Sequence, residues 1–161
     1  MDKFNKLCKD LKLKNKNNYL VINQINNEDA FLDRLASSLN SGADFIEFNP
    51  TFYSTQKAIH LGRKIQQLCK EFDTTFIITE RADIAFILDS DGIVLLQNSF
   101  TPHQAKEILG PNVLIGINCS TQTELNTAIN EDYDFIKTLN FVNINEKIGK
   151  KIFSQVLELN I

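Results

Sequence analysis

The chain has 161 residues, of which 43% are hydrophobic and 23% charged, and its formal net charge is −3. These values are ordinary for a globular protein, and they exclude a strongly basic chain that binds nucleic acid. A chain of this length fits one domain, residues 1–161, whose core is large enough to need neither disulfides nor a structural metal. We therefore expect a single domain with no nucleic-acid partner.

The three cysteines are odd in number and far apart in the sequence, at Cys8, Cys69 and Cys119. This spacing indicates neither a disulfide framework nor a CxxC metal site. No run approaches the about 20 apolar residues that cross a bilayer. We expect reduced thiols in a cytoplasmic protein with no membrane partner.

The first sixteen residues contain six lysines but lack the apolar core of a signal peptide. Phe4, Leu7, Cys8 and Leu11 fall at helical spacing, which predicts an amphipathic helix with a lysine-rich outer face. We favour a helix that covers one end of the domain. The alternative is an anchor on a membrane surface.

Six short runs in the rest of the chain predict buried β-strands, because each is apolar at nearly every position. They span residues 19–23, 44–49, 75–79, 92–97, 113–118 and 134–139. Helical patterns follow each run, at residues 27–40, 54–72, 80–85, 102–109, 121–130 and 145–159. Thr121 with Glu124 resembles a capping box. In the closing helix, Ile148, Ile152, Phe153, Val156 and Leu159 are expected on one face.

The clearest unit spans residues 92–120, where two strands flank one helix of about two turns. Such a βαβ unit implies parallel strands and a right-handed crossover. Six repeats of it predict an α/β domain, either an open doubly wound sheet or a (β/α) barrel. The pattern alone does not separate these two folds, and the chain is short for a full barrel of about 200 residues or more.

Several segments together resemble the thiamine phosphate synthase and thiazole tautomerase superfamily. Residues 76–85 (Phe-Ile-Ile-Thr-Glu-Arg-Ala-Asp-Ile-Ala) are similar to its Ile-Ile-Asn-Asp-Arg-Val-Asp-Leu-Ala, and residues 90–97 (Ser-Asp-Gly-Ile-Val-Leu-Leu-Gln) to its Ala-Asp-Gly-Val-His-Leu-Gly-Gln. Residues 42–49, 109–116 and 132–136 resemble further motifs in the same order. This resemblance, over residues 19–141, implies a TIM-type barrel. We expect an incomplete (β/α) barrel of about six units, with parallel strands and an N-terminal amphipathic helix.

The resemblance also implies a set of substrate-binding positions. In the family, Gln, Arg and Lys of the second strand hold a pyrimidine and its diphosphate, and the matching residues here are Glu47, Asn49 and Thr51. Cations are therefore replaced where the charge of a diphosphate must be neutralised. Beyond the sixth strand, where the family has a Gly, Thr and Lys loop that grips diphosphate, residues 138–141 read Thr-Leu-Asn-Phe.

The family's Asn-Asp pair after the third strand contacts pyrimidine and magnesium, and it corresponds to Thr79 and Glu80. The second magnesium ligand corresponds by spacing to Ser99. The resemblance thus implies Glu80 and Ser99 as metal ligands, with Mg²⁺ as the cofactor if the protein is active.

Some further positions match the family motifs, and others differ from them. Arg81, Asp83, Gly92 and Gln97 match, although Arg81 and Asp83 are equally explained by an ion pair that orders the loop. Asn118 replaces the Ser that opens the loop after the fifth strand. The catalytic His of the tautomerase has no counterpart, and the last two barrel units are missing from this sequence. The predicted substrate-binding residues are therefore Glu47, Asn49, Thr79, Arg81, Gln97 and Asn118, and the catalytic residues remain unassigned.

We therefore expect a thiamine-phosphate-synthase-like protein of thiamine biosynthesis. If active, it is a transferase that couples hydroxymethylpyrimidine diphosphate with thiazole phosphate, and its catalysis is expected to be impaired or lost, as in a pseudoenzyme. The alternative is a non-catalytic binding or assembly module, which forms homo-oligomers through the open edges of the first and sixth strands.

Two other arrangements are open from the residues. Cys119 lies at the end of the fifth strand, where a nucleophile would need a histidine such as His103. Glu47 and Glu80, at the ends of neighbouring strands, are candidates for a carboxylate pair. We favour the plainer interpretation of both sets, in which the histidines are surface or packing residues and the two carboxylates are polar rim residues.

Overall fold

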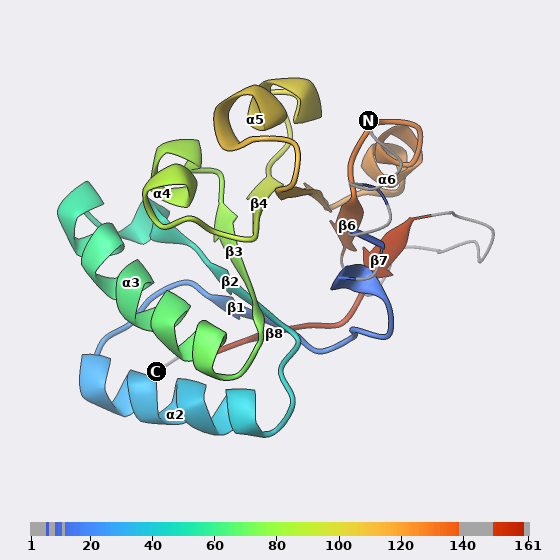
Figure 1. Ribbon diagram of the computed structural model, residues 1–161. Coiled ribbons are helices and arrows are strands. Elements are labelled where there is room, and N and C mark those ends of the chain that lie inside the picture. The colour runs from blue at the N-terminus through green and yellow to red at the C-terminus, as the bar shows by residue number, and fades with distance from the viewer. Residues whose placement is uncertain (1–5, 7–8, 11, 139–149, 160–161) are drawn as a thin grey trace.

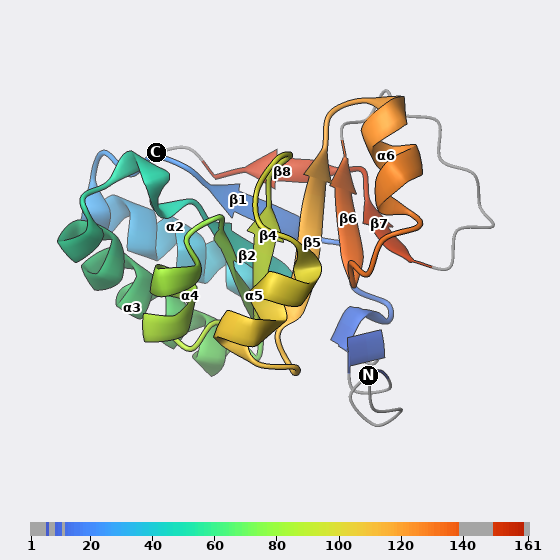
Figure 2. The same cartoon turned by 90° about the horizontal axis from the view of Figure 1, so that it is seen from above.

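A computed structural model describes residues 6, 9–10, 12–138 and 150–159. Its strands form one parallel sheet that is nearly closed into a barrel, with the helices on the outside (Figures 1 and 2). The strands are β1 (Tyr19–Ile22), β2 (Phe45–Phe48), β3 (Thr75–Thr79), β4 (Gly92–Leu95), β5 (Leu114–Cys119), β6 (Phe135–Thr138), β7 (Lys151–Phe153) and β8 (Val156–Glu158). The α/β barrel prediction is confirmed, and the six predicted strands are β1 to β6.

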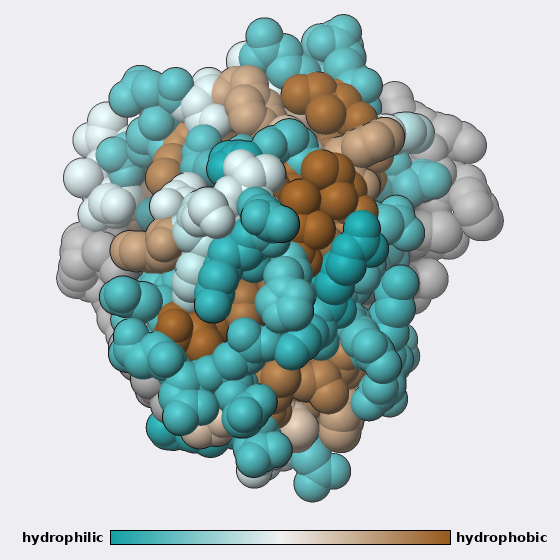
Figure 3. Space-filling model, turned by 90° about the vertical axis from the view of Figure 1, so that its left-hand side faces the viewer, coloured by the Kyte–Doolittle hydropathy of each residue, from teal (hydrophilic) through white to brown (hydrophobic). Residues whose placement is uncertain are grey.

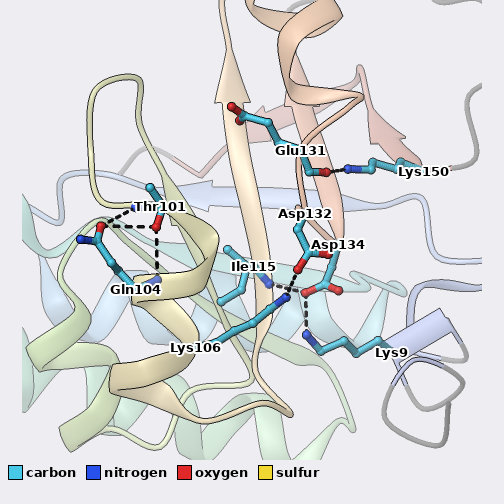
Figure 4. A network of polar contacts seen from close by, with 9 residues as sticks. All are labelled: Lys9, Thr101, Gln104, Lys106, Ile115, Glu131, Asp132, Asp134 and Lys150. Atoms are coloured by element: carbon cyan, nitrogen blue, oxygen red, sulfur yellow. Dashed lines mark hydrogen bonds and ion pairs between the residues drawn. The ribbon is translucent and has the colours of Figure 1, made fainter. Parts of the chain in front are cut away.

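The helices follow the strands as the alternating pattern predicted. They are α2 (Glu28–Asn40), α3 (Thr55–Glu71), α4 (Ala82–Ile87), α5 (Pro102–Leu109) and α6 (Gln122–Ala128), with a short 3-10 helix, η1 (Pro50–Phe52), after β2. The capping box of Thr121 and Glu124 is confirmed, and Thr101 forms a second one with Gln104 (Figure 4). These caps satisfy backbone N–H groups that the first helical turn leaves without partners.

The prediction of a closing helix over residues 145–159 is wrong for the part that the structure describes. Residues 151–158 are extended, and this one segment pairs through β7 with β6 and through β8 with β1. Apolar spacing in the segment fits a helix, but the edges of β1 and β6 offer unpaired backbone groups along their whole length. Sheet pairing satisfies these groups on both sides, so tertiary context overrides the local pattern.

The expected open edges of the first and sixth strands are therefore both paired. Tyr19 lies opposite Val156 in one ladder, and Phe135 lies opposite Lys151 in the other. The barrel is therefore more nearly closed than the six predicted units implied, because residues 151–158 lie in the gap between β6 and β1. The argument for oligomers through those two edges loses its basis, and oligomerisation itself stays a prediction.

The barrel is filled, not hollow. Its inner cluster contains Leu13, Tyr19, Val21, Phe45, Ile77, Val94, Leu114, Phe135 and Phe153. Four of the aromatic rings touch one another, with centroid distances of 4.9 Å for Tyr19 to Phe153 and 6.2 Å for Phe45 to Phe135. Gly116 faces this cluster, and a Cβ there would lie 2.3 Å from the Phe135 ring, so only glycine fits.

The N-terminal segment covers the amino end of this barrel. Lys9 is 2% exposed and donates to the Asp134 carboxylate at 2.8 Å (Figure 4). Lys16 donates to Thr75 at 3.1 Å. Leu13, 7% exposed, reaches the inner cluster from the same segment. The covering helix is thus confirmed for its described residues, whereas the apolar positions Phe4, Leu7, Cys8 and Leu11 lie outside them.

A second core lies between the sheet and its helices. Phe31, Leu35, Leu61, Ile65 and Leu125 are among its fully or nearly fully buried members. The outer face that carries α2 and α3 is mostly hydrophilic with separate apolar patches (Figure 3). Within the described part of the chain, we find no helix with the length and apolar character of a membrane span.

Candidate functional site

The predicted site residues gather at the carboxyl end of the sheet. Asn49 follows β2, Thr79 ends β3, Gln97 follows β4, and Asn118 is the penultimate residue of β5. In parallel barrels, this end is where loops build binding and catalytic sites. The fold therefore brings these side chains to one rim, and their roles toward a ligand stay predictions.

Glu47 lies below that rim, inside the barrel, with 1% of its surface exposed. Its carboxylate accepts hydrogen bonds from the Tyr19 hydroxyl at 2.8 Å and from the Thr79 hydroxyl at 2.6 Å. The Lys137 ammonium donates to both carboxylate oxygens, at 2.9 and 2.8 Å. A buried carboxylate is tolerated only when it is paired and hydrogen-bonded, and Glu47 meets both conditions.

Glu80 and Ser99, the predicted metal ligands, lie at hydrogen-bonding distance. The Ser99 hydroxyl donates to one Glu80 oxygen at 2.9 Å, and the backbone N–H of Leu96 donates to the other. Glu80 has a φ of 60°, in the left-handed region that non-glycine residues rarely adopt, so its backbone is locally strained. No cluster of three or more His, Cys, Asp or Glu residues that could hold a metal occurs in the described ranges. One carboxylate and one hydroxyl suit Mg²⁺ only if waters and a substrate phosphate complete its shell.

Arg81 forms the ion pair that one of the two interpretations predicted. Its guanidinium donates to Asp83 at 2.8 and 2.6 Å, and to the Thr55 hydroxyl at 3.2 Å. The hydrogen bond from Arg81 lowers the pKa of the Asp83 carboxyl. The cation that matches the family by sequence is thus turned toward α3 and α4.

The amide side chains of the rim are also engaged with neighbouring strand ends. Asn49 donates to Asn23 at 3.2 Å, and its oxygen accepts from the Thr51 hydroxyl at 2.7 Å. Gln97 donates to the Asn118 carbonyl at 2.9 Å. These bonds fix the loops after β2 and β4 against their neighbours, with the Gln97 side chain held on the backbone of Asn118.

Comparison with known families bears directly on this arrangement. The family model described as thiamine monophosphate synthase matches residues 18–150, which include every rim residue described above. The chain belongs to this family. It is 33% identical over 108 residues to the thiamine-phosphate synthase of Campylobacter jejuni, covering 66% of this chain and 51% of that protein. With the enzyme of Methanococcus maripaludis, it shares 30% identity over 141 residues, or 88% of this chain and 67% of the relative.

A solved structure agrees with the family assignment. Thiamine phosphate pyrophosphorylase from Pyrococcus furiosus superposes with a TM-score of 0.66 at 27% identity, over 80% of this chain and 61% of that one. The chain thus spans about half to two thirds of the length of these thiamine monophosphate synthase relatives.

Reasoning from the sequence missed Tyr19 and Lys137. The signal was present as a short repeat, because Asp-Phe-Ile occurs at residues 44–46 and 134–136, with the aspartate directly before β2 and β6 and the other two residues opening each strand. Glu47 and Lys137 follow the two copies at the same position. Since side chains alternate along a strand, each lies on the same face as the phenylalanine two residues earlier, and both therefore point into the barrel.

The structure does not bring together the two other pairs considered from the sequence, Glu47 with Glu80 and Cys119 with His103. Glu47 and Glu80 belong to different hydrogen-bond networks, because Glu47 accepts from Lys137 whereas Glu80 accepts from Ser99 and Leu96. His103 contacts Glu107 at 3.4 Å, with its side chain 83% exposed, while the buried Cys119 thiol lies 3.9 Å from the Gln97 amide nitrogen. The Cys119 and His103 arrangement for a nucleophile is not formed.

Both described cysteines are expected to be chemically inert in the folded chain. Burial raises the pKa of Cys69 to about 12 and that of Cys119 to about 11, so little thiolate exists at neutral pH. With Cys8 changed to Ser, Ellman's reagent should react with the native protein at least about a hundredfold more slowly than with the urea-unfolded chain. Fast reaction of one native thiol would contradict this burial.

Proposed function

We propose that this chain is a thiamine-phosphate-synthase-like protein of thiamine biosynthesis that has kept the family scaffold and lost most of its coupling activity. The coupling reaction displaces diphosphate from hydroxymethylpyrimidine diphosphate by thiazole phosphate. Negative charge builds on the departing diphosphate, and cations or a metal must stabilise it. The proposal therefore rests on where the cations of this site are.

The single observation that carries the proposal is that the Lys137 ammonium is paired with the Glu47 carboxylate. Lys137 extends into the barrel below the rim, and Glu47 takes both of its short contacts. Arg81 also donates to Asp83, in an ion pair that is partly exposed. Two cations next to the rim thus carry their own counterions, and a diphosphate would have to displace Glu47 or Asp83 to reach them.

If Mg²⁺ binds, Glu80 and Ser99 are the residues that would hold it, and the ion would supply charge neutralisation for the leaving diphosphate. The other rim residues support recognition of a heterocycle instead of its charged tail. The Thr79 hydroxyl and the Asn49 amide already donate to Glu47 and Asn23, but Gln97 and Asn118 carry neutral amide side chains at the same rim. Such groups hydrogen-bond ring nitrogens and amino groups of a pyrimidine. We infer a ligand of the pyrimidine or thiazole phosphate class, bound mainly through its ring.

Thermal unfolding with four additions tests this proposal: the uncharged hydroxymethylpyrimidine alcohol, its diphosphate ester, the ester with Mg²⁺, and the ester with Mg²⁺ and thiazole phosphate. We expect the ester, with or without Mg²⁺, to raise the unfolding midpoint no more than the alcohol does. A ligand at a hundredfold excess over its Kd stabilises the native state by about 2.7 kcal/mol. A magnesium-dependent rise in the unfolding midpoint that corresponds to this stabilisation, seen with the ester and not with the alcohol, would contradict the proposal. It would instead support an active synthase.

A further inference from the structure

Three donors from three different strands converge on one point inside the barrel. They are the Tyr19 hydroxyl of β1, the Thr79 hydroxyl of β3 and the Lys137 ammonium of β6. All of them contact the same carboxylate, that of Glu47 on β2, within 2.6 to 2.9 Å. One cation and two neutral hydroxyls make a donor set for a carboxylate anion.

The donors are held mainly by the barrel, and the Lys137 ammonium also lies 5.9 Å from the centre of the Tyr19 ring. Tyr19 stacks on Phe45 at 5.5 Å between ring centroids, and its ring also packs against Phe153 at 4.9 Å. Thr79 is 4% exposed at the end of a strand that is buried along its length. Burial, with the Glu47 charge beside it, raises the pKa of Tyr19, so its hydroxyl stays protonated and able to donate.

We propose that Tyr19, Thr79 and Lys137 form an anion site for a short carboxylate, and that the Glu47 side chain occupies it as an internal ligand. Glu47 thereby blocks Lys137 from any external anion, so it acts as an autoinhibitory contact within the barrel. The inference rests on the same contact between Lys137 and Glu47 as the proposed function, and its test uses no thiamine precursor. A failed acetate test would overturn the anion site, whereas loss of coupling activity is decided separately by turnover with the thiamine precursors.

The geometry sets the class of ligand. Changing Glu47 to alanine removes a CH₂–COO⁻ fragment, which has the size and charge of acetate. The two Glu47 oxygens accept four hydrogen bonds, and in the alanine variant the same donors would be available to the two oxygens of acetate. Phosphate is larger and carries four oxygens, whereas the donors that the described residues place here match the two oxygens of a carboxylate.

The experiment compares Glu47→Ala with Glu47→Ala/Lys137→Met in equal concentrations of sodium acetate, sodium chloride and sodium phosphate. Wild type and Glu47→Gln, in which the amide still fills the space, are the matched controls. We expect acetate to raise the unfolding midpoint of Glu47→Ala by at least about 3 °C over chloride, with saturation. The double variant, the wild type and Glu47→Gln should show no such difference, and phosphate should not replace acetate.

If Glu47→Ala does not fold in chloride, the readout becomes the fraction that refolds in acetate, and recovery there supports the proposal. No folding in either salt would overturn it, because acetate would then have failed to replace the lost carboxylate. An equal acetate effect on Glu47→Ala and on its Lys137→Met partner would also overturn it, since the site would not need its cation.

Discussion

Replacing Lys137 with methionine is expected to lower the free energy of unfolding by about 3–5 kcal/mol, as when one partner of a buried ion pair is removed. Methionine fills a similar volume, so the loss comes from charge and not from a cavity. The Glu47 carboxylate, 1% exposed, would remain buried with only the Tyr19 and Thr79 hydroxyls as donors. Urea unfolding of the two proteins measures the difference directly.

The control is the double variant Glu47→Gln/Lys137→Met, which removes both charges and keeps an amide oxygen that accepts from one of the two hydroxyls, while the other hydroxyl can accept from the amide NH₂. It should regain most of the stability that the single variant loses, because a neutral pair has no unpaired buried charge. A single variant within about 1 kcal/mol of wild type would mean that Glu47 is solvated or paired in another way, since exposed pairs contribute only that much.

Removing residues 151–161 should abolish a soluble monomer. The deletion takes away β7 and β8, which pair with β6 and β1. It also removes Phe153, 3% exposed and in contact with three rings of the inner cluster. Loss of a buried aromatic side chain alone costs about 3–5 kcal/mol, and unpaired apolar strand edges associate.

Size-exclusion chromatography and far-UV circular dichroism measure this outcome. Leu157→Ser is the matched control within the same segment, because Leu157 is 66% exposed and its loss should leave both signals unchanged. A truncated chain that elutes as a monomer and unfolds cooperatively would show that the segment is dispensable for the barrel.

Much of the fold follows from local pattern. Each of β1 to β6 is a short apolar run, and the caps at Asn27, Ser54 and Thr121 mark helix starts by residue type. The segment from Lys151 to Glu158 is different, because Ile152, Phe153 and Val156 fit either a helix face or a strand. Its partners, β6 and β1, are far from each other in the sequence, and no local window contains them.

The candidate site could likewise be predicted from the sequence only in part. Residues that follow a strand end, such as Asn49, Glu80 and Gln97, could be placed on one rim because parallel strands share a direction. The partners of Glu47 could not be assigned, because the Lys137 contact spans 90 residues and depends on how the barrel closes. Strand alternation alone could have shown that both side chains point inward.

A turnover assay tests the central claim most directly. The purified protein is incubated with hydroxymethylpyrimidine diphosphate, thiazole phosphate and Mg²⁺, and thiamine phosphate is measured as fluorescent thiochrome after oxidation. The thiamine-phosphate synthase of Campylobacter jejuni serves as the positive control, because it shares the family with this chain. We predict a rate at least about a hundredfold below that of the control, as expected when transition-state charge loses a stabilising cation. A saturable, magnesium-dependent rate within about tenfold of the control would contradict the account, because Lys137 and Arg81 would then not be withheld from the diphosphate.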